Sequence, residues 1–285
     1  MPPRYSPMHV SEIVPMSDRE FRGFRDLVYR ESGIHLSEHK RELLTARLSR
    51  RIRTLGMMRF GQYLTLVERE PQERVEMLDR LVTNETRFFR EPAQFEYLET
   101  QIVPRWRAEA EQRARARRVR VWSAGCSTGQ EPYSIAMTLL AHLEGWDIEV
   151  LATDLSGRAL RQAIAGVWPL DKAAEIPDPY LKAYMMRGVR SQSGRMSASD
   201  AVRAVIRFQR LNLHDELPEL GAFDLIFCRN VLIYFDPASR TRAVARILTR
   251  LTPAGYLFLG HSESLLSSGL RLRPMAPSVY SRMAR

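Results

Sequence analysis

Apolar residues recur at helical spacing through residues 17–90. Ser17 and Glu20 have the spacing of a capping box that starts a first helix, and Ser37 is expected to cap a second helix that Gly56 ends. Two shorter helical patterns follow, over residues 60–67 and 75–82. No alternating strand pattern precedes residue 118, so residues 15–91 are predicted to form an all-α helical domain.

A charged, helix-favouring stretch, residues 92–118, is predicted to be a linker helix into a region where strands and helices alternate. Strands are expected over residues 119–122, 148–153, 205–210, 223–228 and 256–260, and helices over residues 132–143, 156–165 and 238–251. This alternation is typical of a doubly wound α/β domain with a largely parallel sheet, here residues 119–285. Residues 166–204 break the alternation and are predicted to be an insertion with a structure of its own.

The composition is that of an ordinary globular chain, with 45% hydrophobic residues. No apolar run approaches the ~18–20 residues of a membrane helix, and residues 1–15 lack the apolar centre of a secretory signal, so a cytoplasmic protein without membrane insertion is expected. Cys126 and Cys228 are far apart and have no CxxC partner, so we expect no zinc site or disulfide scaffold and predict both thiols to pack in the sheet core.

The formal net charge of +10 favours an anionic partner, although 40 of the 43 basic residues are arginine, a bias that a GC-rich genome also produces. Charge alone does not choose between nucleic acid, an acidic protein surface and a membrane face.

The clearest local signal for a ligand site is the loop after the first predicted strand. Gly125 and Gly129 lie in it, and Pro132 stands where a helix would begin. Glycines let a ligand approach the backbone, and a helix N-terminus binds negative groups, although a tight structural turn would use the same residues. Asp154 closes the next strand, where a carboxylate can bind both hydroxyls of a ribose or else cap the following helix. Together these features favour an adenosine-type cofactor.

Six sequence blocks, in the same order along the chain, resemble the bacterial chemotaxis receptor methyltransferases of the CheR type. They are TNETRFFR at residues 83–90, WSAGCSTGQEPYS at 122–134, ATD at 152–154, LNL at 211–213, FDLIFCRNVLIYF at 223–235 and GHSE at 260–263. The resemblance extends over residues 15–281. It implies an S-adenosylmethionine-dependent enzyme that esterifies glutamate side chains of chemoreceptors and releases S-adenosylhomocysteine, with no metal. It also implies a Rossmann-like methyltransferase domain in which residues 166–204 are a small β-subdomain.

Carried over position by position, the resemblance implies cofactor contacts from the interdomain segment, the glycine loop and the strand ends. The implied residues are Asn84, Thr86, Arg90, Gly125, Glu131, Asp154, Asn212, Leu213, Arg229 and Asn230. Besides the alternatives given above for the glycines and Asp154, structural roles stay open for four more residues. Asn84 and Thr86 could be helix caps. Arg90 could pair with Glu85 or Glu91, and Arg229 with Asp224 or Asp236.

The implied reaction needs no general base, because a glutamate with an unperturbed pKa near ~4.3 is already ionised at neutral pH. The enzyme is expected to hold the carboxylate oxygen and the methyl carbon in near-attack geometry and to exclude water. Tyr234 could orient the substrate or simply pack at the end of the sheet, and structural roles are favoured for His214 and His261.

A basic helix is the second functional candidate. Seven basic residues and one acidic residue lie between positions 40 and 59, and helical geometry predicts that Arg47, Arg50 and Arg53 face solvent. A merely solvated face is the alternative. In the family that the chain resembles, the N-terminal helices face the methylated helix of the receptor's cytoplasmic helical bundle, so charge complementarity to that acidic helix is the preferred interpretation.

Some members of this family add a receptor C-terminal peptide to the β-subdomain as an edge strand. Their loop begins with Gly-x-Gly, whereas this chain has Gly188-Val189-Arg190, and the missing glycine is expected to restrict positive φ and disfavour such a tether. A monomer is expected from the resemblance. A nucleic-acid methyltransferase is an alternative, but the strand-end segment at residues 229–232 lacks the Asp/Asn-Pro-Pro-Tyr/Phe motif. The second alternative is a signalling scaffold that binds the cofactor without catalysing methyl transfer.

Overall fold

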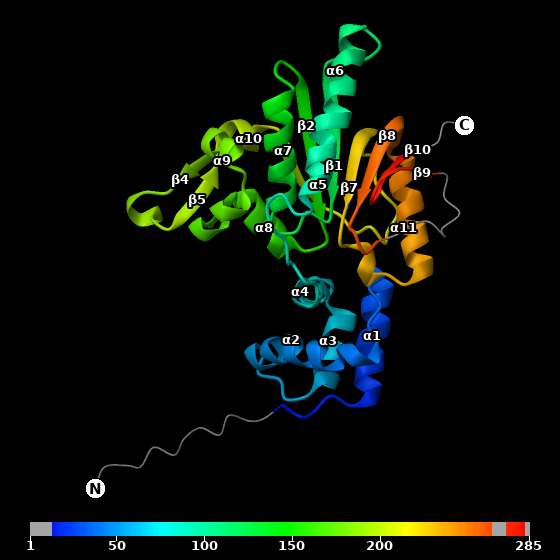
Figure 1. Ribbon diagram of the computed structural model, residues 1–285. Helices are drawn as coiled ribbons and strands as arrows, with labels where there is room; N and C mark the ends of the chain where they lie inside the picture. The colour runs from blue at the N-terminus through cyan, green and yellow to red at the C-terminus, as the bar shows by residue number, and fades with distance from the viewer. Residues whose placement is uncertain (1–12, 264–271, 283–285) are drawn as a thin grey trace. The chain divides into compact units, whose positions relative to one another are not determined.

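The computed structural model describes residues 13–263 and 272–282 (Figure 1). Residues 1–12, on which most of the expectation about a secretory signal rests, lie outside this part. The chain divides into two compact units, residues 1–83 and 84–285, and each is described by itself. The predicted domain boundary, after residue 91, lies inside the second unit.

The first unit is helical. Its elements are α1 (Asp18–Ser32), the 3₁₀ turn η1 (Glu38–Lys40), α2 (Arg41–Thr54), α3 (Phe60–Arg69) and α4 (Pro71–Leu81). The predicted capping box is confirmed, since the Ser17 hydroxyl accepts a hydrogen bond from the Glu20 N–H and the Glu20 carboxylate accepts one from the Ser17 N–H. The predicted cap at Ser37 is wrong. Its side chain makes no cap bond, because the 3₁₀ turn satisfies the Lys40 N–H with the Ser37 carbonyl before α2 begins.

The prediction that Arg47, Arg50 and Arg53 all face solvent is wrong for Arg47. Arg47 is half-buried, and its guanidinium donates to the Leu81 carbonyl at the end of α4 and to the Thr83 hydroxyl, 2.8 Å away. The last carbonyls of a helix have no intrahelical donor, and a long basic side chain supplies one here. Arg50 and Arg53 are exposed, as predicted.

A seven-stranded sheet in the order β6-β2-β1-β7-β8-β10-β9 is the centre of the second unit (Figure 1). Its strands are β1 (Arg118–Ala124), β2 (Asp147–Asp154), β6 (Ile206–Arg210), β7 (Phe223–Cys228), β8 (Leu251–Leu259), β9 (Leu272–Ala276) and β10 (Val279–Arg282). The first five strands in that order are parallel, and β10 pairs antiparallel with both β8 and β9. The predicted Rossmann-like α/β class is therefore confirmed. The β9–β10 hairpin was not predicted, because Pro274 interrupts any strand pattern there.

Helices lie around this sheet. The main ones are α5 (Pro92–Tyr97), the π-helical η2 (Leu98–Ile102), α6 (Val103–Glu111), α7 (Gln130–His142), α8 (Gly157–Ala165), α10 (Asp200–Ala204) and α11 (Pro237–Thr249). The helical stretch predicted over residues 92–118 ends at Glu111, and its residues Phe95 and Trp106 are buried in one core cluster with Val121 and Phe227 of the sheet. It is thus an integral part of the second unit.

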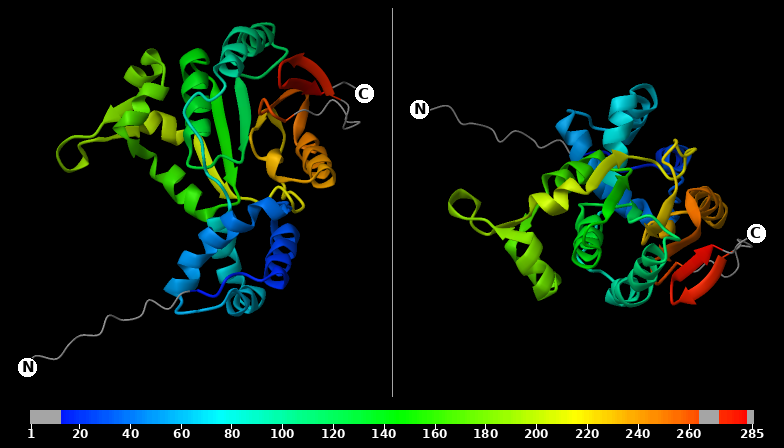
Figure 2. Two further views of the ribbon diagram at one scale, coloured as in Figure 1. Left: turned by 60° about the horizontal axis from the view of Figure 1, so that its bottom comes forward. Right: turned by 90° about the horizontal axis from the view of Figure 1, so that it is seen from above.

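The insertion forms a separate three-stranded antiparallel sheet in the order β3-β5-β4, at the side of the main sheet away from the β9–β10 hairpin (Figures 1 and 2). Its elements are β3 (Val167–Pro169), η3 (Leu170–Glu175), α9 (Asp178–Tyr184), β4 (Met185–Arg187), η4 (Arg190–Gln192) and β5 (Arg195–Ala198). Arg190 has a φ of +53°, so the expectation that its side chain keeps the backbone out of the left-handed region is wrong. The missing glycine therefore does not by itself argue against a docked peptide.

Within the described residues, no helix combines the length and apolar character that crossing a membrane requires.

Candidate cofactor-binding site

Most of the predicted site residues lie at the carboxyl ends of the parallel strands. β1 pairs with β2 on one side and with β7 on the other, so the loops that follow β1 and β7 diverge at a switch point of the topology. In open α/β sheets a ligand binds in the crevice outside this point. Of the predicted residues, Gly125 follows β1, Glu131 lies in the first turn of α7 (Gln130–His142), Asp154 ends β2, Asn212 and Leu213 follow β6, and Arg229 and Asn230 follow β7.

The glycine loop after β1 has left-handed backbone at three positions, Gly125 (φ +94°), Ser127 (φ +50°) and Gly129 (φ +100°), and Gly129 is the N-cap of α7. A Cβ atom at Gly125 would collide with the Val231 side chain, and one at Gly129 would lie 3.0 Å from the Ala163 Cα atom. Packing of the protein against itself therefore already requires both glycines. Their presence is not a signal of ligand contact on its own.

Asp154 connects two of the loops. Its Oδ2 atom accepts a hydrogen bond from the Ser127 N–H and its Oδ1 atom accepts one from the Ser156 N–H, both at 2.8 Å. The N-cap of α8 is Ser156, whose hydroxyl accepts from the Ala159 N–H, so the alternative that Asp154 caps this helix is wrong. The carboxylate lies half-buried at the end of β2 beside the glycine loop.

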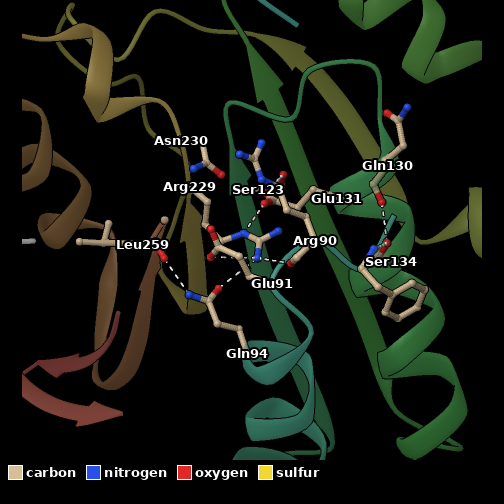
Figure 3. A network of polar contacts seen from close by, with 12 residues as sticks. Arg90, Glu91, Gln94, Ser123, Gln130, Glu131, Ser134, Arg229, Asn230 and Leu259 are labelled. Atoms are coloured by element: carbon tan, nitrogen blue, oxygen red, sulfur yellow. Dashed lines mark hydrogen bonds and ion pairs between the residues drawn. The ribbon is translucent and has the colours of Figure 1, made fainter. Parts of the chain in front are cut away.

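A buried network centred on Arg229 joins three segments (Figure 3). The Arg229 side chain is 1% exposed; its Nε donates to Glu131 Oε2 at 2.7 Å, and its Nη1 donates to the Arg90 carbonyl at 2.6 Å and to Gln94 Oε1 at 3.1 Å. Glu131 Oε1 accepts from the Ser123 hydroxyl at 2.7 Å. Both carboxylate oxygens of Glu131 are thus occupied by protein donors, and the Arg229 guanidinium holds this carboxylate and the start of α5 together.

The ion pairs considered for Arg229 from the sequence are both wrong. Asp224 pairs with Arg115, and Asp236 caps α11 by accepting from the N–H groups of Ala238 and Ser239. The acidic partners of Arg229 are Glu131 and, at 3.6 Å, Glu91. Sequence proximity misled here because a guanidinium at a strand end reaches residues that only the fold brings close.

The segment before α5 is held by two buried aromatic side chains. Phe88 packs edge-on against Trp168 and its N–H donates to Glu175 Oε2 at 2.9 Å. Phe89 stacks on Tyr180. Left-handed backbone at Phe89 (φ +47°) and at Glu91, which is the N-cap of α5 (φ +60°), turns this segment sharply.

The remaining predicted residues lie as follows. Asn84 and Thr86 are half-buried, and neither is the N-cap of α5, so the alternative that they cap this helix is wrong. The described hydrogen bond of Arg90 goes from Nη1 to the Glu85 carbonyl, 3.4 Å away, and not to a carboxylate. Asn212 Oδ1 accepts a hydrogen bond from the His214 N–H. Leu213 is buried and Tyr234 is half-buried.

Two buried acceptors beside these loops have no hydrogen-bond partner in the described structure, the Ser127 hydroxyl oxygen and Glu91 Oε2. Buried oxygens of this kind suit a ligand that presents N–H or O–H donors. Glu91, Gln94 and Ser123 were missed from the sequence; the only signal for Glu91 is that it directly follows the block at residues 83–90.

The cysteines pack as predicted. Cys126 and Cys228 are buried, and burial raises the pKa of both thiols well above the ordinary value, with the nearby Glu131 carboxylate adding to the effect. Neither thiol is suited to nucleophilic chemistry. No group of three or more metal-type side chains was found among the described residues.

The strand order, the switch-point loops and the acidic end of β2 define a Rossmann-like domain that binds a nucleoside-type cofactor. Residues 84–280 match the family "CheR methyltransferase, SAM binding domain", and residues 19–82 match "CheR methyltransferase, all-alpha domain". The chain therefore belongs to the CheR methyltransferase family, and its cofactor is S-adenosylmethionine.

Named relatives cover nearly the whole chain. The chain is 37% identical to chemotaxis protein methyltransferase 2 of Pseudomonas aeruginosa, over 97% of each chain. It is 36% identical to the chemotaxis protein methyltransferase of Escherichia coli, over 96% of this chain and 94% of the relative. Among solved structures, the amino pentose methyltransferase CalS10 of Micromonospora echinaspora matches with 18% identity and a TM-score of 0.32, over 62% of this chain and 58% of that one, a likeness too low to bear on function.

Proposed function

We propose that this protein transfers the methyl group of S-adenosylmethionine to glutamate side chains of methyl-accepting chemotaxis receptors, giving glutamate methyl esters. One observation carries the proposal: a chain with the fold of a cofactor-binding methyltransferase is similar along nearly all of its length to proteins named chemotaxis protein methyltransferases. Because those names do not state the acceptor group, the glutamate carboxylate is part of the proposal.

The donors and acceptors of the site fit such a cofactor. In our proposal Asp154 binds the ribose hydroxyls, and Asn212 and Leu213 lie beside the adenine. Asn84, Thr86 and Arg90 contact the cofactor from the segment before α5. The Ser127 hydroxyl oxygen and Glu91 Oε2, which have no hydrogen-bond partner in the described structure, accept from its donor groups. Arg229 and Glu131 bind each other and further groups of the protein, so we assign them to holding the floor of the site, with Asn230 and Gly125 in the adjoining loops.

The chemistry asks little of the enzyme beyond positioning. The bound cofactor supplies an electrophilic methyl group on a sulfonium, and an ionised glutamate is already a nucleophile at neutral pH. The protein therefore has to align the two groups and exclude water, and no general base is assigned. Tyr234, half-buried in the 3₁₀ turn η5 (Leu232–Tyr234) after β7, is proposed to orient the substrate carboxylate.

On the first unit, the exposed Arg50 and Arg53 of α2 are proposed to face the acidic methylation helix of the receptor's cytoplasmic bundle. Attraction of this kind raises the rate of association more than the final affinity. Arg47 is not included in this proposal, because its guanidinium binds the end of α4.

The proposal is tested with methyl-labelled S-adenosylmethionine and receptor-bearing membranes, followed by mild alkali. Carboxyl methyl esters hydrolyse under these conditions, so we expect the label on receptor protein and its release as volatile methanol. Receptors whose methylation glutamates are changed to alanine are the matched control and are expected to stay unlabelled. Label that is stable to alkali, or present on nucleic acid instead, contradicts glutamate esterification.

A further inference from the structure

The block at residues 260–263 has no part in the function proposed above, yet it ends in one of the most buried carboxylates of the protein. Glu263 follows β8 by four residues and is 1% exposed. A carboxylate withdrawn from water to this degree is costly unless its oxygens accept hydrogen bonds. Its partners therefore indicate what it does.

The Glu263 side chain accepts backbone N–H groups from the segment that follows β7 and from Gly260, directly after β8. Its Oε2 atom accepts from the Asn230 N–H at 2.7 Å and from the Gly260 N–H at 2.8 Å, and its Oε1 atom accepts from the Ile233 N–H at 3.2 Å. Burial raises the pKa of this carboxyl, and the backbone hydrogen bonds oppose that rise. An acceptor with two oxygens is needed, because every one of these partners donates.

The turns of the chain after β7 and after β8 bring backbone N–H groups to the Glu263 carboxylate. β7 and β8 are parallel neighbours with Cys228 opposite Leu259, and the chain turns after each of them. Asn230 turns with a left-handed φ of +59°. At Gly260 a Cβ atom would lie 2.7 Å from Asn230 Nδ2 and 2.8 Å from Glu263 Oε2, so a side chain there would displace both groups.

The hydrogen bonds of Glu263 are connected to the buried network centred on Arg229. Gln94 Nε2 donates to the Leu259 carbonyl at 2.7 Å, while its Oε1 accepts from Arg229 (Figure 3). The Glu263 and Glu131 carboxylates both raise the pKa of the Cys228 thiol, which lies at the end of β7. The turn over residues 230–233 thus starts from the buried network and leads directly into Tyr234.

We propose that Glu263 is a positioning residue for methyl transfer, whose carboxylate fixes the turn at residues 230–233 and with it the place of Tyr234 at the substrate carboxylate. The inference rests on the proposed function. It explains why the end of β8, which provides none of the proposed cofactor contacts, has a glycine and a glutamate three residues apart.

The test compares wild type with Glu263→Gln, an isosteric change that turns an amide NH₂ towards backbone donors. We expect kcat for receptor methylation to fall by about tenfold or more, while the Kd for S-adenosylmethionine, measured by calorimetry, changes by less than about threefold. Glu216→Gln, at an exposed glutamate of the same unit, is the matched control and should leave both quantities unchanged.

Hydrogen exchange of the wild-type protein provides a measurement that does not depend on the variant's folding. The amides of Asn230, Ile233 and Gly260 are expected to exchange slowly. Unprotected amides, an unchanged kcat in Glu263→Gln, or equal losses of kcat and cofactor binding that follow the loss of folded protein would each overturn the inference. Wild type that methylates no receptor would instead count against the proposed function, and the exchange result would still stand.

Discussion

The buried cation of Arg229 joins three segments of the candidate site through contacts with the protein alone. Its guanidinium is nearly unexposed, binds Glu131, Gln94 and the Arg90 carbonyl, and lies over the rings of Phe95 and Phe227. Removing one partner of a buried ion pair leaves an uncompensated charge, at a cost of about 3–5 kcal/mol. Variants of Arg229 or Glu131 will therefore lose structure together with activity, and neither residue suits a test of cofactor contact.

Asp154 is half-buried and suits such a test better. The Asp154→Ala variant is expected to weaken binding of S-adenosylmethionine by about tenfold to a hundredfold, or about 1.4–2.7 kcal/mol. The acceptors for the ribose hydroxyls are lost, and the Ser127 and Ser156 N–H groups that Asp154 accepts also lose their partner. Titration calorimetry measures the affinity directly. Asp171→Ala, at an exposed aspartate of η3, is the control and should bind normally. Unchanged affinity in Asp154→Ala would remove the ribose assignment.

At the scale of elements, the inserted β-subdomain is packed against the segments proposed to hold the cofactor. Trp168 of β3 contacts Phe88 and donates from its indole N–H to the Thr128 carbonyl in the glycine loop, 3.3 Å away. Glu175 of η3 accepts the Phe88 N–H. These contacts suggest that the insertion supports the cofactor site whether or not it also docks a receptor peptide.

Loss of the Glu175 acceptor tests this support. In Glu175→Ala the Phe88 N–H has no partner, and we expect the affinity for S-adenosylmethionine to fall by about fivefold to thirtyfold, or about 1–2 kcal/mol. Lys172→Ala is the matched control, because it removes the other partner of Glu175, at 2.7 Å, and keeps the acceptor. Equal affinities in the two variants would show that the insertion does not support the site.

The helical unit contains an ion pair with a predictable response to pH. Glu73 accepts from Arg51 at 2.5 and 2.8 Å and from the Tyr63 hydroxyl at 2.8 Å. The hydrogen bonds from Arg51 are the main cause that lowers the pKa of Glu73 below its ordinary value of 4.5. The native state therefore binds fewer protons than the unfolded state, so this stabilisation is complete above about pH 4.5 and is lost as the pH falls through the lower native pKa.

The Glu73→Gln variant should make that difference visible. We expect it to lower the free energy of unfolding by about 2 kcal/mol at neutral pH and to flatten the loss of stability on acidification below about pH 4.5. Scanning calorimetry of the full chain at several pH values measures both. Glu68→Gln, at an exposed position of α3, should behave like wild type. The same acid sensitivity in Glu73→Gln and wild type would contradict the assignment.

For the whole molecule, the net charge of +10 can attract a partner only through arginines that are exposed and do not pair with acidic residues of the protein itself. Many are committed, as Arg51 is to Glu73, Arg120 to Glu149, and Arg229 to Glu131. Arg50 and Arg53 are exposed on one helix. They are the part of the excess charge that we propose acts on the receptor.

Charge reversal at these positions gives the corresponding prediction. Arg50→Glu/Arg53→Glu should slow receptor methylation by about tenfold at low ionic strength, with a smaller difference at high salt, because screening weakens the interaction of exposed charges. Cofactor affinity should not change. The control, Arg113→Glu/Arg117→Glu, makes the same charge change at exposed positions just before β1 and should methylate receptors like wild type. Equal slowing in both variants would indicate a general charge effect and no specific surface.

The sequence by itself determined the helical first unit, the alternating elements of the α/β unit and the presence of an interruption after residue 165. Each of these depends on local periodicity, which a chain carries whatever its tertiary partners are. The six contiguous blocks between residues 83 and 263 likewise indicated the family and its cofactor, because the residues within each block are neighbours in the chain.

Tertiary structure alone decided which side chains these residues meet. Arg47 binds the end of α4, Arg229 pairs with Glu131, and Glu263 accepts N–H groups from two strand ends. Those partners are 34, 98 and, for Asn230, 33 residues apart along the chain. A buried polar group binds whichever complementary group the fold brings within hydrogen-bond reach, and no local pattern records that distance.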